Sequence, residues 1–170
     1  MSADAGHPPA NPPVEGVWVG LGANLGDAHA TLSAALAALA NLPGTTVLRH
    51  SSVYRTAPVD ADGPDYLNAV AELRTTLAPL ALLDALQALE LAHGRQRPYR
   101  NAPRTLDMDV LLWAQAQIQH PRLSVPHPRL AERAFVLLPL AELAPQLLIP
   151  GQPALPMLLA QVAHQRIERL

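Results

Sequence analysis

Apolar and polar positions alternate along the chain in patterns that predict strands and helices in turn. Residues 17–21 (VWVGL) form a β-branched and aromatic run that is typical of a buried strand. After a glycine-rich turn, apolar residues recur at the spacing of one helix face from Leu32 to Leu39. The folded part of the chain is therefore predicted to begin with a strand, a turn and a helix.

The middle of the chain predicts two strands without a helix between them. Residues 45–55 are strand-like, and in 66–76 apolar side chains alternate with polar ones such as Asn68, as in a half-exposed strand. The segment 56–65 between them is a loop rich in Pro, Asp and Gly. Because long loops in small domains usually carry function, we expect this loop to belong to a site.

The second half of the chain predicts another helix and another strand. Residues 79–93 have a proline near the start, leucines on one stripe and a glycine after the end, which are the signals of a helix. Gln87 and Glu90, three positions apart, are placed on a different face of this helix from the leucines. A strand within 103–113 follows, and then turns with a short strand.

This order, β-α-β-β-α-β with additions, predicts an α+β fold with a ferredoxin-like βαββαβ core, an antiparallel sheet and helices on one face. The additions are a C-terminal hairpin and helices, one of them over 130–143 and broken at Pro139. The other face of the sheet would stay free for a site. A parallel doubly wound sheet is the alternative, but two adjacent strands between 45 and 76 argue against it.

Length and composition limit the kinds of protein that fit. The 170 residues suffice for one domain, placed at 16–170 after a Pro- and Ala-rich leader, 1–15, that is expected to be disordered. Cysteine is absent, so a metal would be held by oxygen or imidazole. The net charge of −2 argues against nucleic acid as partner. Without a signal peptide or a bilayer-spanning apolar run, the chain is expected in the cytoplasm and away from membranes.

Positive charge is concentrated in one part of the chain. All 12 basic residues are arginines, and seven of them lie between 95 and 133. They are Arg95, Arg97, Arg100, Arg104, Arg122, Arg129 and Arg133. Arginine keeps its proton and binds phosphate or carboxylate groups with two parallel hydrogen bonds, so this stretch predicts an anionic ligand.

Two aspartates stand inside the apolar strand that follows the basic loop. Strand side chains alternate, so Asp107 and Asp109 project from one face, roughly 6 to 7 Å apart, while their neighbours point to the other. Two such carboxylates repel unless a cation lies between them, and Mg²⁺ completes its shell with substrate phosphates. A solvated strand face, or an ion pair of Arg104 with Asp107, is the structural alternative. Nearby arginines favour a metal and phosphate site.

Two other features have alternative interpretations. The glycines of GLGANLG are spaced one residue wider than a dinucleotide-binding fingerprint, and no P-loop motif is present, so these glycines are assigned to a tight turn. His127 lies between two prolines in VPHPRL. A lone histidine is more often structural, but its place beside the arginines makes a phosphate contact credible.

Taken in order, the segments VGLGANLGD, SSVYRTAPV, PDYLNAV, ELAHGRQR, PRTLDMDVLL and LSVPHPRLAERAFVLLPLAELAP, from 19 to 145, resemble the 6-hydroxymethyl-7,8-dihydropterin pyrophosphokinase family. The resemblance implies transfer of pyrophosphate from ATP to the hydroxymethyl group of a reduced pterin, with release of AMP, in folate biosynthesis. It implies two Mg²⁺ ions as cofactors, held by Asp107 and Asp109. ATP and the reduced pterin would be the partners, and the chain is expected to be a monomer.

The resemblance also assigns roles to residues by their position in the family's motifs. Arg95 and Arg104 would close over the triphosphate as catalytic residues together with the two aspartates. The ATP-binding residues would be Gln87, Glu90, Arg97, Arg122, His127 and Arg133. The pterin-binding residues would be Thr56, Val59, Tyr66, Asn68 and Phe135, the last as a stacking partner.

The chain departs from the family pattern in the segment before PRT. The family usually has tryptophan and glycine where this chain has Asn101 and Ala102, so the aromatic lid over the pterin is missing at that position. Pro98 would stiffen the same loop, and Tyr99 is a candidate replacement for the aromatic ring.

Two other functions are the alternatives to the pyrophosphokinase reaction. A ferredoxin-like module that binds a nucleotide without chemistry would need the arginines but not two metal-binding carboxylates. A palm-like nucleotidyltransferase would use the two aspartates, but its nucleic acid substrate would require a wider basic surface than this chain's net charge provides.

Overall fold

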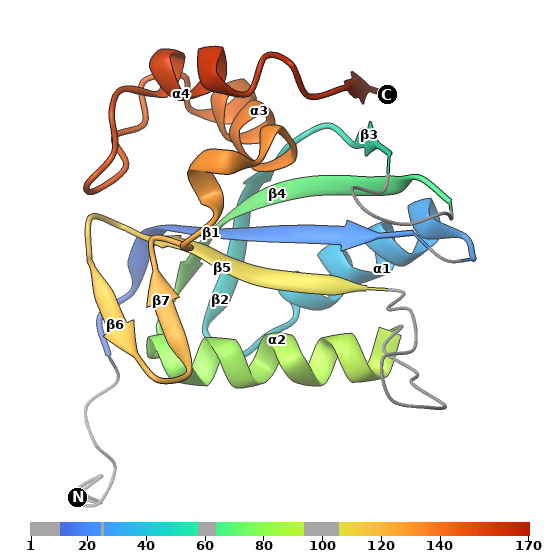
Figure 1. Ribbon diagram of the computed structural model, residues 1–170. Coiled ribbons are helices and arrows are strands. Elements are labelled where there is room, and N and C mark those ends of the chain that lie inside the picture. Colours follow the sequence, from blue (N-terminus) through green and yellow to red (C-terminus); the bar gives the residue numbers. More distant parts are fainter. Residues whose placement is uncertain (1–10, 25, 58–63, 94–105) are drawn as a thin grey trace, which may run out of the picture.

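The helices and strands follow each other in the predicted order (Figure 1). The computed structural model describes residues 11–24, 26–57, 64–93 and 106–170. The first half forms β1 (Val14–Ala23), α1 (Ala28–Ala40), β2 (Thr45–His50), β3 (Tyr54–Thr56), β4 (Tyr66–Thr75) and α2 (Pro79–His93). The second half forms β5 (Asp107–Trp113), β6 (Ile118–His120), β7 (Leu123–Val125), a 3₁₀ turn (Leu130–Glu132), α3 (Ala134–Leu143), α4 (Leu155–Gln161) and β8 (Ile167–Arg169).

The main sheet has the strand order β5-β1-β4-β3-β8, and β2 also pairs with β4. Strands β1 and β2, joined through α1, lie on either side of β4, which is the split βαβ arrangement. All pairings of the described sheet are antiparallel. The ferredoxin-like prediction is therefore confirmed, and the parallel doubly wound alternative is wrong.

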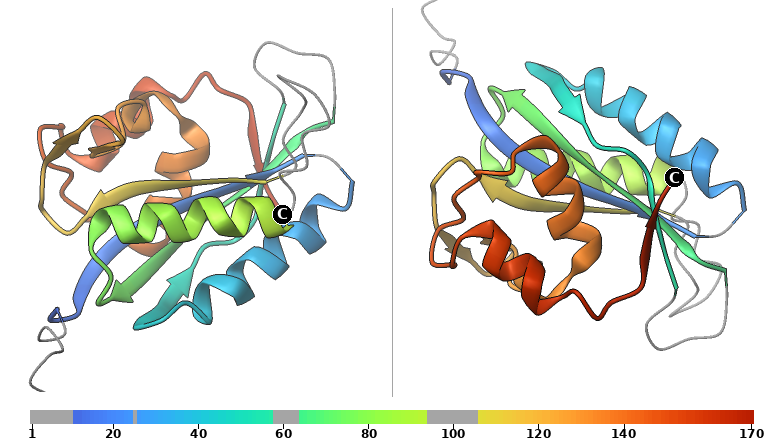
Figure 2. Two further views of the ribbon diagram at one scale, coloured as in Figure 1. Left: turned by 90° about the horizontal axis from the view of Figure 1, so that it is seen from below. Right: turned by 90° about the horizontal axis from the view of Figure 1, so that it is seen from above.

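Helices lie on both faces of the sheet. Helices α1 and α2 cover the lower face in Figure 1, and α3 and α4 lie above it; Figure 2 shows each side in turn. The lower face buries one apolar core, with Val19, Leu73 and Leu86 fully buried. The upper face buries a second core around Trp18, Val70 and the helices α3 and α4. The C-terminal helices thus close part of the face that was expected to stay free, and they restrict the site to the remainder.

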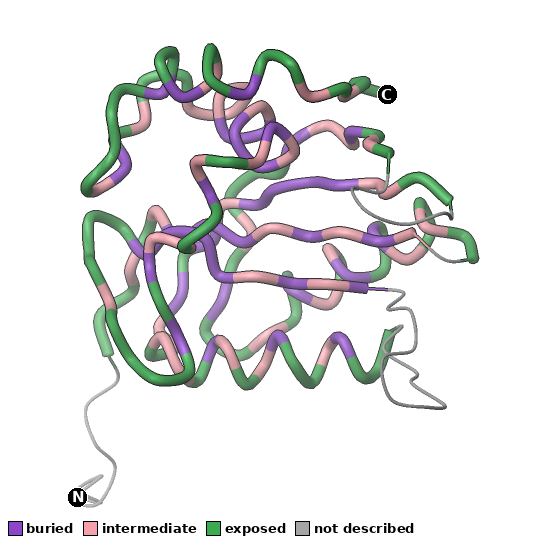
Figure 3. The backbone as a smooth tube through the Cα atoms, in the orientation of Figure 1, coloured by how far each residue is buried: buried purple, intermediate pink, exposed green. Residues whose placement is uncertain are grey.

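Strand β4 is buried more completely than its alternation predicts (Figure 3). Asn68 is only 5% exposed and Val70 is fully buried, because α3 packs over this face of the strand. The sequence predicts a half-exposed strand, but Arg74 is the exposed residue of β4 in the structure, with Tyr66, Leu67 and Glu72 partly buried. The polar side chain of Asn68 is therefore buried and must find hydrogen-bond partners within the fold.

Three local expectations are corrected by the structure. The strand-like segment 45–55 divides into β2 and β3, with Ser51 Oγ accepting from the Val70 amide at the break. Helix α3 runs through Pro139 without a break, because Pro139 is buried against the second core and packing outweighs the lost hydrogen bond. Of the three glycines assigned to a tight turn, Gly20 and Gly22 lie within β1, and only Gly26, with φ +64°, lies in the turn.

Among the described residues, no helix combines the length and the apolar character needed to cross a bilayer.

Candidate active site

The two aspartates of β5 project from the sheet face opposite to α1 and α2. Met108 and Val110, the residues between and after them, are buried in the core of the lower face. Asp107 and Asp109 are half-buried on the other side, as strand alternation requires. The predicted placement of both carboxylates on one strand face is confirmed.

The register of the sheet places Asp107 in line with Asn68. Gly22 of β1 pairs with Asp107 on one side and with Asn68 of β4 on the other. Directly paired residues share a face, so the carboxylate and the carboxamide are two strands apart, about 10 Å, with Gly22 between them. Because Gly22 has no side chain, the Asn68 carboxamide can lie close to this position, between the two strands.

Gly22 is a site residue that the sequence interpretation missed. A Cβ at this position would lie 3.1 Å from Asn68 Oδ1, which is closer than an ordinary contact. Glycine within a strand often marks a place where another group approaches the backbone. The signal in the sequence was the pair Gly20 and Gly22, which are two positions apart at the end of a predicted strand. Strand residues two apart share a face, so both glycines lie on the site face.

A β-bulge in β5 joins the His127 loop to the aspartate strand. The pairing of β1 with β5 shifts so that Val19 faces Val110 and Trp18 faces Leu112, which leaves Leu111 as the extra residue. The Leu111 carbonyl accepts a hydrogen bond of 2.9 Å from the His127 amide. The bulge thus fixes the histidine loop beside Asp109, and no sequence pattern indicated it.

His127 is held in one tautomer by its own loop. The amide of Arg129 donates to His127 Nδ1 at 3.1 Å, so in the neutral ring the proton lies on Nε2. Burial lowers the pKa of His127, and the charges of Arg133 and Arg129 lower it further, against an opposing effect of Asp109. A neutral His127 therefore offers an N–H donor on Nε2.

Arg133 connects the aspartates with Phe135. Burial lowers its pKa, while Asp109 and, less strongly, Asp107 act to raise it, so both carboxylates lie within electrostatic reach of the guanidinium. The same guanidinium stands 5.4 Å from the centroid of the Phe135 ring, a cation–π distance. Arginine keeps its charge, so Arg133 supplies a fixed positive group beside two negative ones.

The predicted pterin residues on β3 and β4 lie together. Thr56 pairs with Tyr66 across the two strands, and Asn68 Nδ2 donates to Thr56 Oγ1 at 3.1 Å. Tyr66 and Thr56 are half-buried on the same face as Asn68. Phe135 is half-buried at the first turn of α3, against the second core. The structure therefore places four of the five predicted pterin residues on the site side of the sheet.

An open cavity of about 250 Å³ lies beside Asp109, along the β6–β7 hairpin. It is lined by Asp109, His127 and Arg122 together with apolar residues of α2 and β5. Arg122 forms an ion pair with Asp84 of α2. The volume of this cavity is below the roughly 300–1,000 Å³ of most ligand pockets, so it could enclose only part of a ligand of that size.

The two helix residues predicted to bind ATP differ in exposure. Gln87 is exposed, whereas Glu90 is 5% exposed and continues the buried line of Leu82 and Leu86. Positions four apart share a helix face, and this places Glu90 with the leucines. The expectation that Gln87 and Glu90 share a face away from the leucines is therefore wrong for Glu90.

Several predicted residues lie outside the described part of the chain. They are Val59 of the first loop and Arg95, Arg97 and Arg104 of the basic loop. The departures from the family pattern, Pro98, Tyr99, Asn101 and Ala102, are also outside it.

The chemistry of the available ligands fits a hard cation. The described residues contain no group of three or more His, Cys, Asp or Glu side chains able to hold a metal ion. Two carboxylates on one strand face suit Mg²⁺, which keeps several waters and takes its remaining ligands from substrate phosphates. Asp107 and Asp109 therefore fit a magnesium ion that binds together with a phosphate-bearing substrate.

Comparisons with known proteins identify the family to which the chain belongs. Residues 18–145 match the family model described as 7,8-dihydro-6-hydroxymethylpterin-pyrophosphokinase (HPPK). The chain is 49% identical over 158 residues to the 2-amino-4-hydroxy-6-hydroxymethyldihydropteridine pyrophosphokinase of Pseudomonas aeruginosa, covering 92% of this chain and 98% of that protein. It is 41% identical to the enzyme of the same name from Haemophilus influenzae, over 90% of this chain and 96% of the relative.

Solved structures show the same fold. The wild-type HPPK-DHPS of Plasmodium falciparum superposes with a TM-score of 0.70 at 14% identity, covering 90% of this chain. An HPPK-DHPS in complex with substrates gives a TM-score of 0.70 at 13% identity, over 94% of this chain. The chain spans less than half of each of these solved chains, 42% and 47%.

Proposed function

Because this chain belongs to the 7,8-dihydro-6-hydroxymethylpterin-pyrophosphokinase family, we propose that Asp107 and Asp109 form the magnesium centre of its reaction. The chain transfers pyrophosphate from ATP to the hydroxymethyl group of 6-hydroxymethyl-7,8-dihydropterin in folate biosynthesis. The observation that carries the proposal is the common face of the two aspartates, next to His127 and Arg133. A kinase of this family requires a divalent metal.

In this proposal, Asp107 and Asp109 would hold two Mg²⁺ ions, which would supply positive charge to offset that of the ATP phosphates. The side chains supply position and charge. His127 donates through Nε2 to a phosphate oxygen, and Arg133 provides a permanent positive charge beside it. Arg95, Arg97 and Arg104 would add positive charge over the triphosphate, with Arg122 at the edge of the cavity.

The pterin is proposed to lie between β4 and α3. Asn68 and Thr56 would bind its amide edge, with Tyr66 and Val59 beside them, and Phe135 would stack on the ring. Gly22, which pairs with both Asn68 and Asp107, then lies between the pterin and the metal-binding aspartates. Such an arrangement sets the hydroxymethyl oxygen in line with the β-phosphorus, so that catalysis comes from orientation and charge stabilisation.

The adenine is proposed to lie near α2. Gln87 is exposed on this helix and accessible to a nucleotide, whereas Glu90 is buried and would act from within the fold. We further propose that residues 16–170 form one pyrophosphokinase unit after a disordered leader, 1–15, and that the protein is a cytoplasmic monomer.

A turnover assay tests the proposal directly. The protein is incubated with ATP, Mg²⁺ and 6-hydroxymethyl-7,8-dihydropterin, and AMP is followed by chromatography with and without the pterin. AMP that requires both the pterin and Mg²⁺ is the expected result. Nucleotide binding that ignores Mg²⁺ and yields no AMP would instead identify a nucleotide-binding module.

A further inference from the structure

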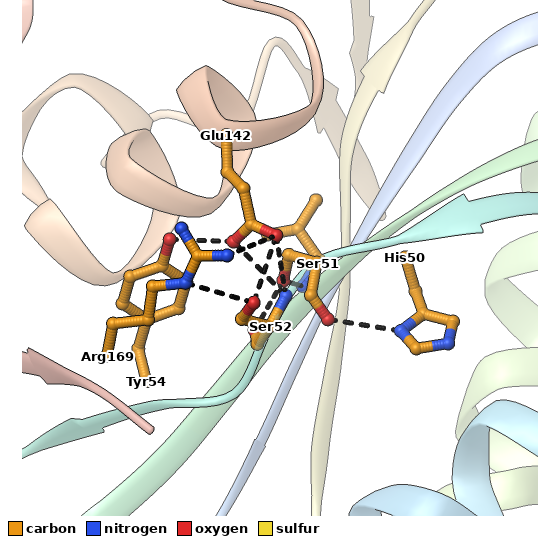
Figure 4. A network of polar contacts seen from close by, with 7 residues as sticks. His50, Ser51, Ser52, Tyr54, Glu142 and Arg169 are labelled. Carbon is orange, nitrogen blue, oxygen red and sulfur yellow. Dashed lines mark hydrogen bonds and ion pairs between the residues drawn. The ribbon is translucent and has the colours of Figure 1, made fainter.

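A cluster of polar side chains lies at the end of α3, outside the residues assigned to catalysis (Figure 4). We call it the Glu142 cluster: Ser52, Tyr54, Glu142 and Arg169. Its members come from the β2–β3 connection, β3, α3 and β8. Glu142 stands at its centre, with a side chain that is 17% exposed. A carboxylate so well covered requires partners, and this one has several.

The hydrogen bonds of Glu142 join α3 to β3. Tyr54 donates its hydroxyl to Glu142 Oε1 at 2.7 Å, and the Ser52 amide donates to both carboxylate oxygens at 3.0 and 3.1 Å. Ser52 Oγ donates to Oε2 at 3.1 Å, and Arg169 lies 3.6 Å away. Hydrogen bonds to an ionised acceptor are stronger and more directional than neutral ones, so the cluster fixes β3 relative to the helix.

The charge states of the cluster favour these bonds. Burial alone would raise the pKa of Glu142, but the hydrogen bonds from Tyr54 and Ser52 and the charge of Arg169 outweigh it and lower the pKa. Burial, the hydrogen bond to Glu142 and the negative charge of Glu142 raise the pKa of Tyr54 to about 12. Around neutral pH, Glu142 is therefore an ionised acceptor while Tyr54 keeps its proton and donates.

Two of the elements joined by the cluster, β3 and α3, each carry a proposed pterin residue. Tyr54 pairs directly with Asn68, and Thr56, two positions further along β3, accepts the bond from Asn68 Nδ2. Strand residues two apart share a face, so Tyr54 and Thr56 move together. On α3, Phe135 precedes Glu142 by seven residues, which is two turns and about 10 Å on the same side of the helix.

We propose that Glu142 is a positioning residue of the pterin subsite, because its carboxylate holds β3 against α3 and so sets the spacing between Thr56, Asn68 and Phe135. The short strand β3 has three residues in register with β4 and three with β8, and the bonds of Tyr54 and Ser52 to Glu142 link this region to α3. The inference rests on the proposed pterin contacts and adds to them a residue that touches neither substrate.

Kinetics of single variants test this role. Glu142→Gln keeps the size of the side chain but removes its charge, and Tyr54→Phe removes only the hydroxyl at 2.7 Å. We expect the KM for the pterin to rise about tenfold in Glu142→Gln and about threefold in Tyr54→Phe, with the KM for ATP and kcat within about twofold of the unaltered protein. If Glu142→Gln does not fold, Tyr54→Phe tests the positioning role by the same comparison of the KM for the pterin with the KM for ATP and kcat.

Glu72→Gln is the matched control. Glu72 is also well covered, 13% exposed, and pairs with Arg49, which donates to the Leu143 carbonyl at the same end of α3. It touches no residue of β3 in the described structure, so a comparable loss of stability should leave the KM for the pterin unchanged. An equal rise in both KM values, no change in either variant, or the same pterin effect in Glu72→Gln would overturn the positioning role.

Pterin binding measured by calorimetry separates this inference from the proposed function. If the unaltered protein binds the pterin but forms no AMP, the proposed function fails, and weaker pterin binding in Glu142→Gln still supports the positioning role. If AMP forms and Glu142→Gln binds the pterin as tightly as the unaltered protein, the positioning role fails alone.

Discussion

The two faces of the sheet are built from the same strands but serve different purposes. Toward α1 and α2, strands β1, β4 and β5 contribute mainly apolar side chains to the core, among them Val19, Leu73 and Val110. On the other face the same strands contribute apolar residues and the buried Asn68 where α3 and α4 cover them, and Asp107 and Asp109 elsewhere. Each strand thus supports the site with residues that alternate with those of the core.

This difference shows why the site can be rigid without being buried. The residues on either side of Asp109 along β5 are held in packed cores, so the carboxylate has little freedom although it faces a cavity. Substitutions on the two faces should therefore have separable effects, on stability for one face and on turnover for the other.

The largest effect is expected from Asp109→Ala on the site face. Loss of one metal-binding carboxylate should lower kcat by about 10³-fold, near 4 kcal/mol of activation free energy, while the affinity for the pterin changes little. Steady-state kinetics and pterin titration measure the two quantities. Glu15→Ala is the control, because Glu15 is an exposed carboxylate at the opposite end of β1 from Gly22. Equal losses in turnover and pterin affinity would contradict a metal-binding role.

A substitution on the core face should show the opposite pattern. Leu73→Ala removes a fully buried side chain from the core beneath the sheet and should lower the free energy of unfolding by about 3 kcal/mol. At temperatures where the variant stays folded, kcat should remain within about twofold. Urea unfolding measures the free energy of unfolding, and steady-state kinetics on the same sample measure kcat. A large loss of kcat in a fully folded variant would show that the faces are not separable.

Gly22→Ala tests whether the pterin-binding and ATP-binding parts of the site face can be affected separately. The added Cβ would lie 3.1 Å from Asn68 Oδ1, so Asn68 must shift and its bond to Thr56 is strained. We expect about tenfold weaker pterin binding with unchanged ATP binding. In the control, Gly20→Ala, the new Cβ meets Leu111 at 3.4 Å, an ordinary contact, and should have little effect. Similar behaviour of both variants would remove Gly22 from the pterin subsite.

The smallest effect is expected from acidification at the Glu142 cluster. The pKa of Glu142 in the folded protein lies below its ordinary value of 4.5, so the ionised carboxylate stabilises the fold above about pH 4.5. This contribution is lost as the pH falls through the lowered pKa. The difference in Tm between the unaltered protein and Glu142→Gln, about 2–4 °C at pH 7, should shrink at acidic pH. A difference that grows on acidification contradicts an ionised Glu142.

The local elements were predictable because their signals are local. The helix over 79–93 was predicted with its observed bounds, and the alternation around Asp107 and Asp109 fixed their common face. At Pro139 tertiary packing overrode a local rule, because α3 continues through a buried proline. Glu90 is different, since its spacing of four residues from Leu86 already places it on the buried face of α2.

The pterin residues were assigned by resemblance to a family, and residue patterns alone would not have found them. Asn68 looks like a surface residue of a half-exposed strand, and nothing near it in the chain shows that α3 covers it. The link from Tyr54 to Glu142 spans 88 residues and has no local signal in either segment.

The sequence by itself determined the kind of protein: one set of strands and helices in ferredoxin-like order, with two aspartates on one strand face and arginines around them. Only the tertiary structure decided that Gly22 separates Asp107 from Asn68, that a bulge at Leu111 joins His127 to β5, and that Glu142 joins α3 to β3. The period of a strand or helix follows from the residues within it. Register, bulges and distant hydrogen bonds depend on how separate segments meet, and they are set by packing of the whole chain.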